Sequence, residues 1–310
     1  MRFRPDFRMS SLTTPQRASD PSERSERIRS ERLTEGCKSE NEKVPSSERA
    51  VFGLPTIVIL GPTGSGKTGV SIEIAKKIDG EIISADSRAI YKGMDIGTAK
   101  PTPEEQQGVL HYGIDLVNPG ERFTVADWKS YAEEKIADIK SRGKVPIIVG
   151  GTGLYIDALI YDYHFKGPTG HKIGDYEQKT CSDRQQIKGD YIIVGIEWPT
   201  EELRARLSKR IEQMFSPELF EEVKKLVQLY GWKNQAMKSD IYEYAWKYLQ
   251  GELTLEEAKQ RCFFEDWHLA KRQLTWFKRN RQIVWLKLND VLPYFVSKID
   301  TKRTASEDEA

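Results

Sequence analysis

The feature that most constrains the fold is a glycine-rich loop after a β-branched run at residues 56–60. Its sequence is Gly61-Pro62-Thr63-Gly64-Ser65-Gly66-Lys67-Thr68, which fits the phosphate-loop pattern G-x-x-x-x-G-K-[S/T]. Apolar residues at helical spacing follow in residues 68–78. Strand, loop and helix in this order create an anion site, because glycines let backbone N–H groups turn inward and the helix N-terminus adds positive potential.

We therefore expect Gly61 through Thr68 to bind phosphate. Lys67 is predicted to offer a charge to the terminal phosphates, and Thr68 a hydroxyl to Mg²⁺. The loop alone does not identify the reaction, since kinases, ATPases and other transferases share it.

Strand-like runs alternate with helix-like segments through the middle of the chain. Runs rich in Ile and Val occupy residues 56–60, 81–84, 145–149 and 190–196, and helical periodicity marks residues 68–78 and 125–139. This alternation predicts an α/β fold, a parallel P-loop sheet flanked by helices. A helical C-terminal part is expected nearly to Leu286, in segments 201–215, 217–230, 239–250, 254–264 and 266–283.

Composition suggests boundaries along the chain. Residues 1–50 mix Ser, Arg and Glu with few apolar residues, which predicts a disordered extension. A transit peptide is the alternative, although such peptides avoid acids. Residues 51–290 are expected to form the P-loop domain, and residues 291–310 a C-terminal tail that is frayed beyond Lys298.

Charge and cysteine usage narrow the class of protein. The net charge of +1 gives no general reason to expect a nucleic-acid partner, so any basic surface must be local. The three cysteines lie far apart without metal-ligand spacing, which favours free thiols in a reducing compartment. No apolar run approaches the roughly 20 residues needed to span a bilayer. We expect a cytoplasmic monomer without a membrane partner.

A carboxylate follows the second expected strand, at Asp86. In an open parallel sheet, ligands bind beyond the carboxyl ends of the strands, so Asp86 is expected near whatever the phosphate loop holds. From its position alone, this carboxylate could ligate Mg²⁺, cap a helix or act as a general base.

Three further segments carry a recognisable pattern. They are Ile83–Arg88 continuing with Tyr91–Pro101, then Val149–Tyr155, and finally Ala270–Phe277. With the phosphate loop they make four separated matches, in the expected order, to the tRNA dimethylallyltransferases (isopentenyltransferases). The chain resembles this family closely over residues 55–165 and more loosely over residues 190–286.

The resemblance implies that the phosphate loop holds dimethylallyl diphosphate instead of ATP. The dimethylallyl group then passes to N6 of a flipped-out adenine next to the anticodon of a tRNA. The family's general base maps onto Asp86, its catalytic threonine at the diphosphate end onto Thr152, and a diphosphate-binding arginine onto Arg210. Lys67, Arg210, backbone amides and Mg²⁺ are expected to stabilise the departing diphosphate.

Contacts to tRNA are expected at two places. The first is the segment Asp86, Ser87, Arg88 and Ala89, and the second is one side of an amphipathic helix that carries Lys271, Arg272 and Lys278. A merely solvated basic face is the alternative to contact with a phosphate backbone. Trp276 and Trp285 are predicted to be packing residues rather than platforms for a base.

The departures from the family fall on the acceptor side. Where the family carries a helical insertion, residues 160–189 leave only a reduced one, and Asp240–Tyr244 replaces a glycine–tyrosine–basic motif. Prenylation of a free adenine nucleotide therefore stays open as an alternative function. A catalytically impaired RNA-binding relative is a second alternative.

Overall fold

The computed structural model describes residues 54–165, 176–177 and 186–308. The extension predicted for residues 1–50 and most of the reduced insertion lie outside the described residues. In the part of the chain that is described, no helix combines the length and the apolar character needed to cross a membrane.

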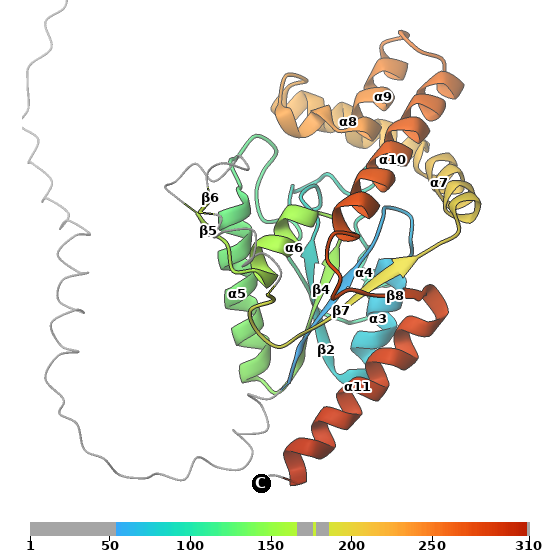
Figure 1. The fold of residues 1–310 in the computed structure, drawn as a ribbon. Helices are drawn as coiled ribbons and strands as arrows, with labels where there is room; N and C mark the ends of the chain where they lie inside the picture. The colour runs from blue at the N-terminus through green and yellow to red at the C-terminus, as the bar shows by residue number, and fades with distance from the viewer. Residues whose placement is uncertain (1–53, 166–175, 178–185, 309–310) are drawn as a thin grey trace, which may run out of the picture. The chain divides into compact units, whose positions relative to one another are not determined.

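A parallel sheet of six strands forms the centre of the fold (Figure 1). The strand order is β3-β2-β4-β1-β7-β8, and every adjacent pair is parallel. The strands are β1 (Thr56–Leu60), β2 (Gly80–Ala85), β3 (His111–Tyr112), β4 (Val145–Gly150), β7 (Tyr191–Glu197) and β8 (Val284–Lys287). Strands β1 and β4 are buried along their whole length, as Ile- and Val-rich runs require. The predicted α/β fold is confirmed.

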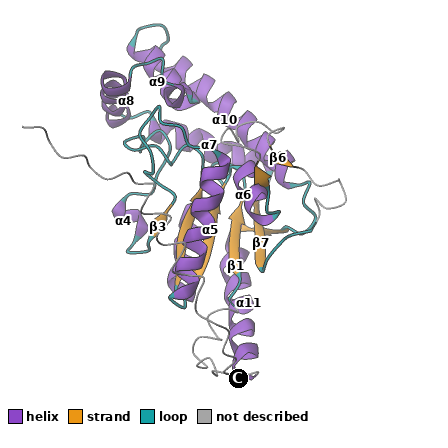
Figure 2. Ribbon diagram, turned by 90° about the vertical axis from the view of Figure 1, so that its left-hand side faces the viewer, coloured by secondary structure: helices purple, strands orange, loops and turns teal. Residues whose placement is uncertain are grey.

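Helices cover both faces of the sheet. Since side chains alternate along a strand, Ile57 and Ile59 of β1 face one core, and Val58 and Leu60 face the other. The first core contains residues of α3 (Lys67–Ile78) and α11 (Leu288–Asp308). The second contains residues of α5 (Val125–Ser141) and α6 (Gly153–Ile160), and Figure 2 shows α5 lying across this face. Short elements complete this part: α4 (Pro103–Gln106) and the antiparallel pair β5 (His164–Phe165) and β6 (Tyr176–Glu177).

The C-terminal segment differs from the expected tail. Residues 288–308 form the helix α11, in which Val291, Phe295 and Ile299 are fully buried against the sheet. These residues recur every fourth position, so they form one stripe on the helix, and partly buried apolar residues such as Leu292 and Val296 pack beside it. The prediction of a tail after residue 290, frayed beyond Lys298, is therefore wrong for the described residues.

A group of helices stands beyond the carboxyl ends of the strands (Figures 1 and 2). It consists of α7 (Thr200–Met214), α8 (Pro217–Tyr230), the 3₁₀ turn η2 (Gln235–Lys238), α9 (Asp240–Leu249) and α10 (Leu255–Phe277). We call these helices the helical part. Two segments predicted at 254–264 and 266–283 are in fact the single helix α10, followed by the unpredicted strand β8. The end of α10 reaches the sheet, where Phe277 is buried in the core beneath α5 and α6.

Candidate active site

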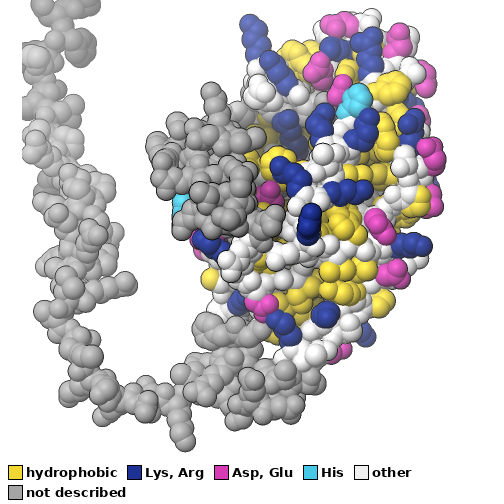
Figure 3. Space-filling model, viewed as in Figure 1, with side chains coloured by type: hydrophobic (Ala, Val, Ile, Leu, Met, Phe, Trp, Pro, Cys, Tyr) yellow, Lys and Arg dark blue, Asp and Glu magenta, His cyan; other side chains and the backbone are white. Residues whose placement is uncertain are grey.

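A cavity of about 960 Å³ lies between the carboxyl ends of the strands and the helical part. All four motifs found in the sequence contribute to its lining: residues 63–68, 86–88 with 97–99, 151–154, and 272, 273 and 276. The helix α7 adds Arg206, Lys209 and Arg210. The lining carries six Lys or Arg side chains and two carboxylates, Asp86 and Asp266. A site of this charge suits an anionic ligand. On the face shown in Figure 3, Lys and Arg side chains gather around the region where α10 meets the sheet.

The phosphate loop has the conformation that its glycines predict. Gly64 and Gly66 have φ angles of 74° and 88°, in the left-handed region, and α3 begins directly after Gly66. The ammonium of Lys67 is turned into the loop, where it donates to the carbonyl oxygens of Gly61 at 3.0 Å and Pro62 at 2.7 Å. Burial lowers the pKa of Lys67 to about 8, with Asp86 opposing this shift and Arg210 adding to it. Among the described residues, no carboxylate contacts the ammonium of Lys67. The ammonium is therefore available to bind a phosphate group.

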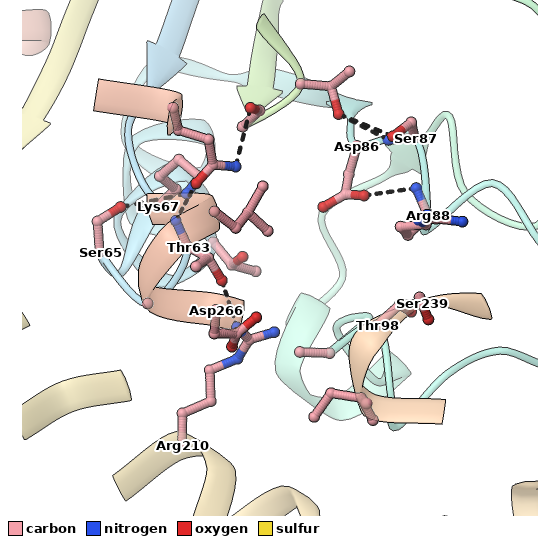
Figure 4. A pocket seen from close by; sticks show the side chains of 18 of the residues that line it. Thr63, Ser65, Lys67, Asp86, Ser87, Arg88, Thr98, Arg210, Ser239 and Asp266 are labelled. Carbon is pink, nitrogen blue, oxygen red and sulfur yellow. Dashed lines mark hydrogen bonds and ion pairs between the residues drawn. The ribbon is translucent and has the colours of Figure 1, made fainter. Parts of the chain in front are cut away.

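Asp86 starts the turn that follows β2. Its Oδ1 accepts hydrogen bonds from the backbone N–H groups of Arg88 at 2.8 Å and Ala89 at 3.4 Å. The second carboxylate oxygen points into the cavity (Figure 4). The turn fixes the orientation of the carboxylate, and one oxygen remains directed into the cavity. Ala89 itself is buried and does not line the cavity.

Thr152 links the ends of two neighbouring strands. Its backbone N–H donates to the carbonyl of Ala85 at 3.1 Å, and its Oγ1 accepts from the N–H of Ser87 at 3.0 Å. The hydroxyl also lies 3.3 Å from the Ser87 hydroxyl. The side chain therefore sits beside the Asp86 turn, at the margin of the cavity where α6 begins.

The helices α7 and α10 hold the phosphate loop from the opposite side. Arg210 donates to the hydroxyl of Thr63 and, at 3.2 Å, to Asp266, which is only 6% exposed (Figure 4). Gln273 accepts from the N–H of Thr63 at 2.8 Å and donates to the carbonyl of Gly151 at 3.1 Å. Arg206 donates to the carbonyl of Gly64 at 2.9 Å.

Known proteins with the same pattern identify the family. The family descriptions "IPP transferase" and "Isopentenyl transferase" match residues 89–173 with 165–280 and residues 55–117, respectively. The tRNA dimethylallyltransferase of Staphylococcus haemolyticus is 39% identical over 276 residues, covering 72% of this chain and 83% of that protein. That of Anoxybacillus flavithermus is 34% identical over 286 residues, covering 77% and 92%. The chain belongs to the tRNA dimethylallyltransferase family.

A solved structure of the family has the same fold. The tRNA delta(2)-isopentenylpyrophosphate transferase of Staphylococcus epidermidis superposes with a TM-score of 0.70 at 34% identity, covering 80% of this chain and 99% of that chain. As a member of the tRNA dimethylallyltransferase family, the protein is a prenyltransferase, which agrees with the resemblance read from the four motifs.

The residues expected on the tRNA side divide into two sets. Arg88 and Arg272 line the cavity, whereas Lys271 and Lys278 are exposed on α10 and its C-cap, outside the lining. Trp276 packs in the core, as predicted. It donates to Asp157 at 2.8 Å and packs against the core below α5 and α6, and it also forms part of the cavity wall. Trp285 packs against the same core, as predicted.

Three residues of the site were not singled out from the sequence. Asp266 and Gln273 belong to α10. Gln273 lies within the segment Ala270–Phe277 that matches the family, and Asp266 lies four residues before Ala270, hence on the same face of the helix. Arg206 lies four residues before Arg210, hence on the same face of α7. That spacing was available in the sequence and would have pointed to it.

Mg²⁺ is compatible with the residues present. Among the described residues, no group of three His, Cys, Asp or Glu side chains could enclose a metal ion. Mg²⁺ in phosphate sites usually takes one or two protein oxygens and completes its octahedron with phosphate oxygens and water. Thr68 and Asp86 line the same cavity and supply oxygens of this kind.

Proposed function

We propose that the protein transfers a dimethylallyl group from dimethylallyl diphosphate to N6 of an adenine next to the anticodon of a tRNA. The observation that carries this proposal is the shared cavity: the phosphate loop and Asp86 face the same space, and cations surround it. The curated relatives are named for this reaction, and one related structure is described as a dimethylallyltransferase acting on tRNA.

The donor diphosphate belongs on the phosphate loop. Backbone N–H groups at residues 63–68 and the N-terminus of α3 favour an anion there. Lys67 exchanges its two carbonyl partners for phosphate oxygens, and Arg210 approaches from α7. Asp266 keeps the guanidinium of Arg210 beside the loop before the donor arrives. This preorganisation lets the cations stabilise charge as it develops on the leaving group.

The transfer joins N6 of the adenine to C1 of the dimethylallyl group. The C1–O bond breaks, its electron pair leaves with the diphosphate, and N6 gives up one proton. We assign that proton to the cavity-facing oxygen of Asp86, because the turn already occupies the other oxygen. Thr152 lies beside the Asp86 turn and is assigned to the diphosphate end of the reacting bond. Mg²⁺, when bound, adds positive charge at the diphosphate, with Thr68 as its protein ligand.

The tRNA is proposed to cover the cavity mouth and the basic side of α10. Ser87 and Arg88 lie in the lining, and Arg272 extends the positive surface toward the exposed Lys271 and Lys278. Cations outside the cavity suit a phosphate backbone longer than a single nucleotide provides, which favours tRNA over a free adenine nucleotide. That the protein acts as a monomer stays a prediction.

A transfer assay tests the proposal. Purified protein is incubated with labelled dimethylallyl diphosphate and either unmodified tRNA or AMP. We expect label in tRNA, at adenine N6. Label in AMP but not in tRNA would support the free-nucleotide alternative. Donor binding without transfer to either acceptor would support the impaired relative.

The variant Asp86→Asn tests the base. An asparagine can still accept the two backbone hydrogen bonds of the turn, but it cannot take a proton at neutral pH. We expect the single-turnover rate with bound tRNA to fall by about 10²–10⁴-fold while donor affinity changes little. A rate near that of the unaltered protein would remove Asp86 from this role.

A further inference from the structure

The loop between β2 and α4 forms the part of the cavity wall that lies opposite the phosphate loop. Gly97, Thr98 and Ala99 line the cavity there, and Figure 4 shows Thr98 across the open space from Lys67. None of the three carries a charge, whereas the phosphate-loop side and α7 carry Lys67 and Arg210. A neutral wall of small residues suits a flat base better than a diphosphate. This wall lies on the side of the cavity away from the phosphate loop, where the acceptor base is expected once the donor occupies the loop.

A carboxylate from the helical part holds this loop. Glu222 of α8 accepts hydrogen bonds from three successive backbone N–H groups, those of Asp95 at 3.1 Å, Ile96 at 2.9 Å and Gly97 at 3.3 Å. Its Oε1 also accepts from the hydroxyl of Tyr242 at 2.6 Å. Consecutive N–H groups that converge on one anion form a nest, and bonds to a charged acceptor are stronger than neutral ones.

Tyr242 of α9 packs tightly against the same loop. Its side chain is completely buried, and a Cβ atom placed on Gly97 would lie 2.5 Å from the aromatic ring. Only glycine permits this approach. Burial and the neighbouring Glu222 raise the pKa of Tyr242, so the hydroxyl keeps its proton and remains a donor to the carboxylate. Glu222 and Tyr242 therefore act on the loop together, the first through charge and the second through contact.

The loop also has bonds of its own. The Thr98 hydroxyl donates to the carbonyl of Met94, and Lys100 donates to the side chain of Asp95 at 2.8 Å. These bonds give the loop its internal shape. The bonds to Glu222 and Tyr242 instead set its distance from the helical part, and hence where the neutral wall stands relative to Asp86.

We propose that Glu222, supported by Tyr242, is a positioning residue for the acceptor: it places the wall Gly97–Ala99 so that the acceptor base is held against Asp86. This inference rests on the proposed transfer to an adenine. Glu222 itself does not line the cavity and acts through the loop. A tRNA gains most of its affinity from phosphate contacts, so a displaced wall affects the rate of transfer more than tRNA binding.

The variant Glu222→Gln removes the charge and turns one acceptor oxygen into a donor that opposes a backbone N–H. We expect kcat to fall by about tenfold to a hundredfold, with the Kd for dimethylallyl diphosphate and the KM for tRNA within about twofold. The matched control is Glu221→Gln, one residue earlier on α8, whose side chain is 72% exposed and pairs with Lys224 at the surface. It is expected to leave kcat, KM and thermal stability unchanged.

The variant Tyr242→Phe provides a second test. It keeps the aromatic ring beneath Gly97. It removes one bond to Glu222 and is expected to lower kcat in the same direction but by less. Because both changes act on one loop, their effects on kcat should not be additive in the double variant. The double variant should lose less than the product of the two separate losses.

The outcomes separate this inference from the proposed function. If unaltered protein labels tRNA and Glu222→Gln, still folded at the assay temperature, keeps its kcat, the positioning role is wrong and the contact is only structural. The role is also wrong if donor affinity falls as much as kcat. If Glu222→Gln does not fold, an unchanged kcat in Tyr242→Phe overturns the role. If unaltered protein labels no tRNA, the proposed function fails and the inference fails with it.

Discussion

The state of Lys67 predicts how donor binding depends on pH. Burial lowers the pKa of Lys67 to about 8 in the free protein, and a bound diphosphate raises it again by placing anionic oxygens beside the ammonium. The measured affinity for dimethylallyl diphosphate is therefore proportional to the fraction of the free protein in which Lys67 is already protonated. With this pKa, the fraction falls from about nine-tenths at about pH 7 to about one-tenth at about pH 9.

The expected result is a loss of affinity of about tenfold, or about 1.4 kcal/mol, between those two pH values. Terminal phosphates have a pKa of about 6, so the donor itself does not change charge in this window. Calorimetric titration with the donor in the absence of tRNA measures the effect. Binding near about pH 8 should also take up protons, which appears as a heat that depends on the buffer.

The variant Lys67→Arg is the matched control, since a guanidinium remains protonated throughout the window. Its affinity is expected to be independent of pH over this range, whatever its absolute value. Lys67→Ala, which binds more weakly, should be independent of pH as well. Equal pH profiles for unaltered protein and Lys67→Arg would refute the argument that burial depresses the pKa of this lysine.

Two further predictions concern residues that the structure revealed. Gln273→Leu leaves the N–H of Thr63 and the carbonyl of Gly151 without their partner, so the donor Kd should rise by about five- to tenfold in calorimetry. Thr275→Ala, an exposed change on the same helix, should leave the Kd unchanged. Phe295→Ala empties a fully buried position of α11 and should lower the free energy of unfolding by about 3–5 kcal/mol in urea titrations. Lys298→Ala, at an exposed position of α11, should change it by less than about 0.5 kcal/mol, and equal stabilities would show that α11 contributes nothing to the core.

The sheet could be predicted because its central strands are continuous apolar runs. Residues 56–60 and 145–149 are short β-branched runs that end at glycines, which favours buried parallel strands, and the phosphate loop marked the end of the first strand. The edge strand β3 has two partly buried residues, so no apolar run marked it. The edge strand β8 coincides with the apolar run at residues 283–286, but this run follows a long helical pattern directly, so the helical prediction continues into it. The helix α11 was missed because its sequence resembles a polar tail. The buried Val291, Phe295 and Ile299, and the partly buried apolar residues of the helix that pack beside them, all lie within residues 288–299, and Pro293 interrupts them.

The candidate site could be predicted where a functional residue lies in a short segment at the end of a strand. Lys67 begins the helix after the phosphate loop, and Asp86 directly follows β2, so both lie where strand ends meet at one edge of a parallel sheet. The resemblance to the family supplied Thr152. The contacts from α7 and α10 could not be predicted in the same way. Thr63 and Gln273 are 210 residues apart, and nothing local shows which face of a long helix meets the loop. The resemblance to the family supplied Arg210, which spacing alone did not.

The cavity lining separates the residues proposed to bind the donor from the reduced insertion that the sequence predicts. Every described residue that lines the cavity comes from the sheet loops before residue 155 or from the helical part after residue 205. The described residues of the reduced insertion, near β5, β6 and Ile187, lie outside that lining. We therefore expect changes in the insertion to leave Lys67 and Arg210, the residues proposed to bind the donor, in place. Residues 240–244, where the sequence departs from the motif that the resemblance predicts, include Tyr242, whose ring lies directly against Gly97 of the neutral wall and whose hydroxyl donates to Glu222. If Glu222 has the proposed positioning role, Tyr242 is the residue of this segment that supports it, so the departures at the neighbouring positions are expected to leave the wall in place.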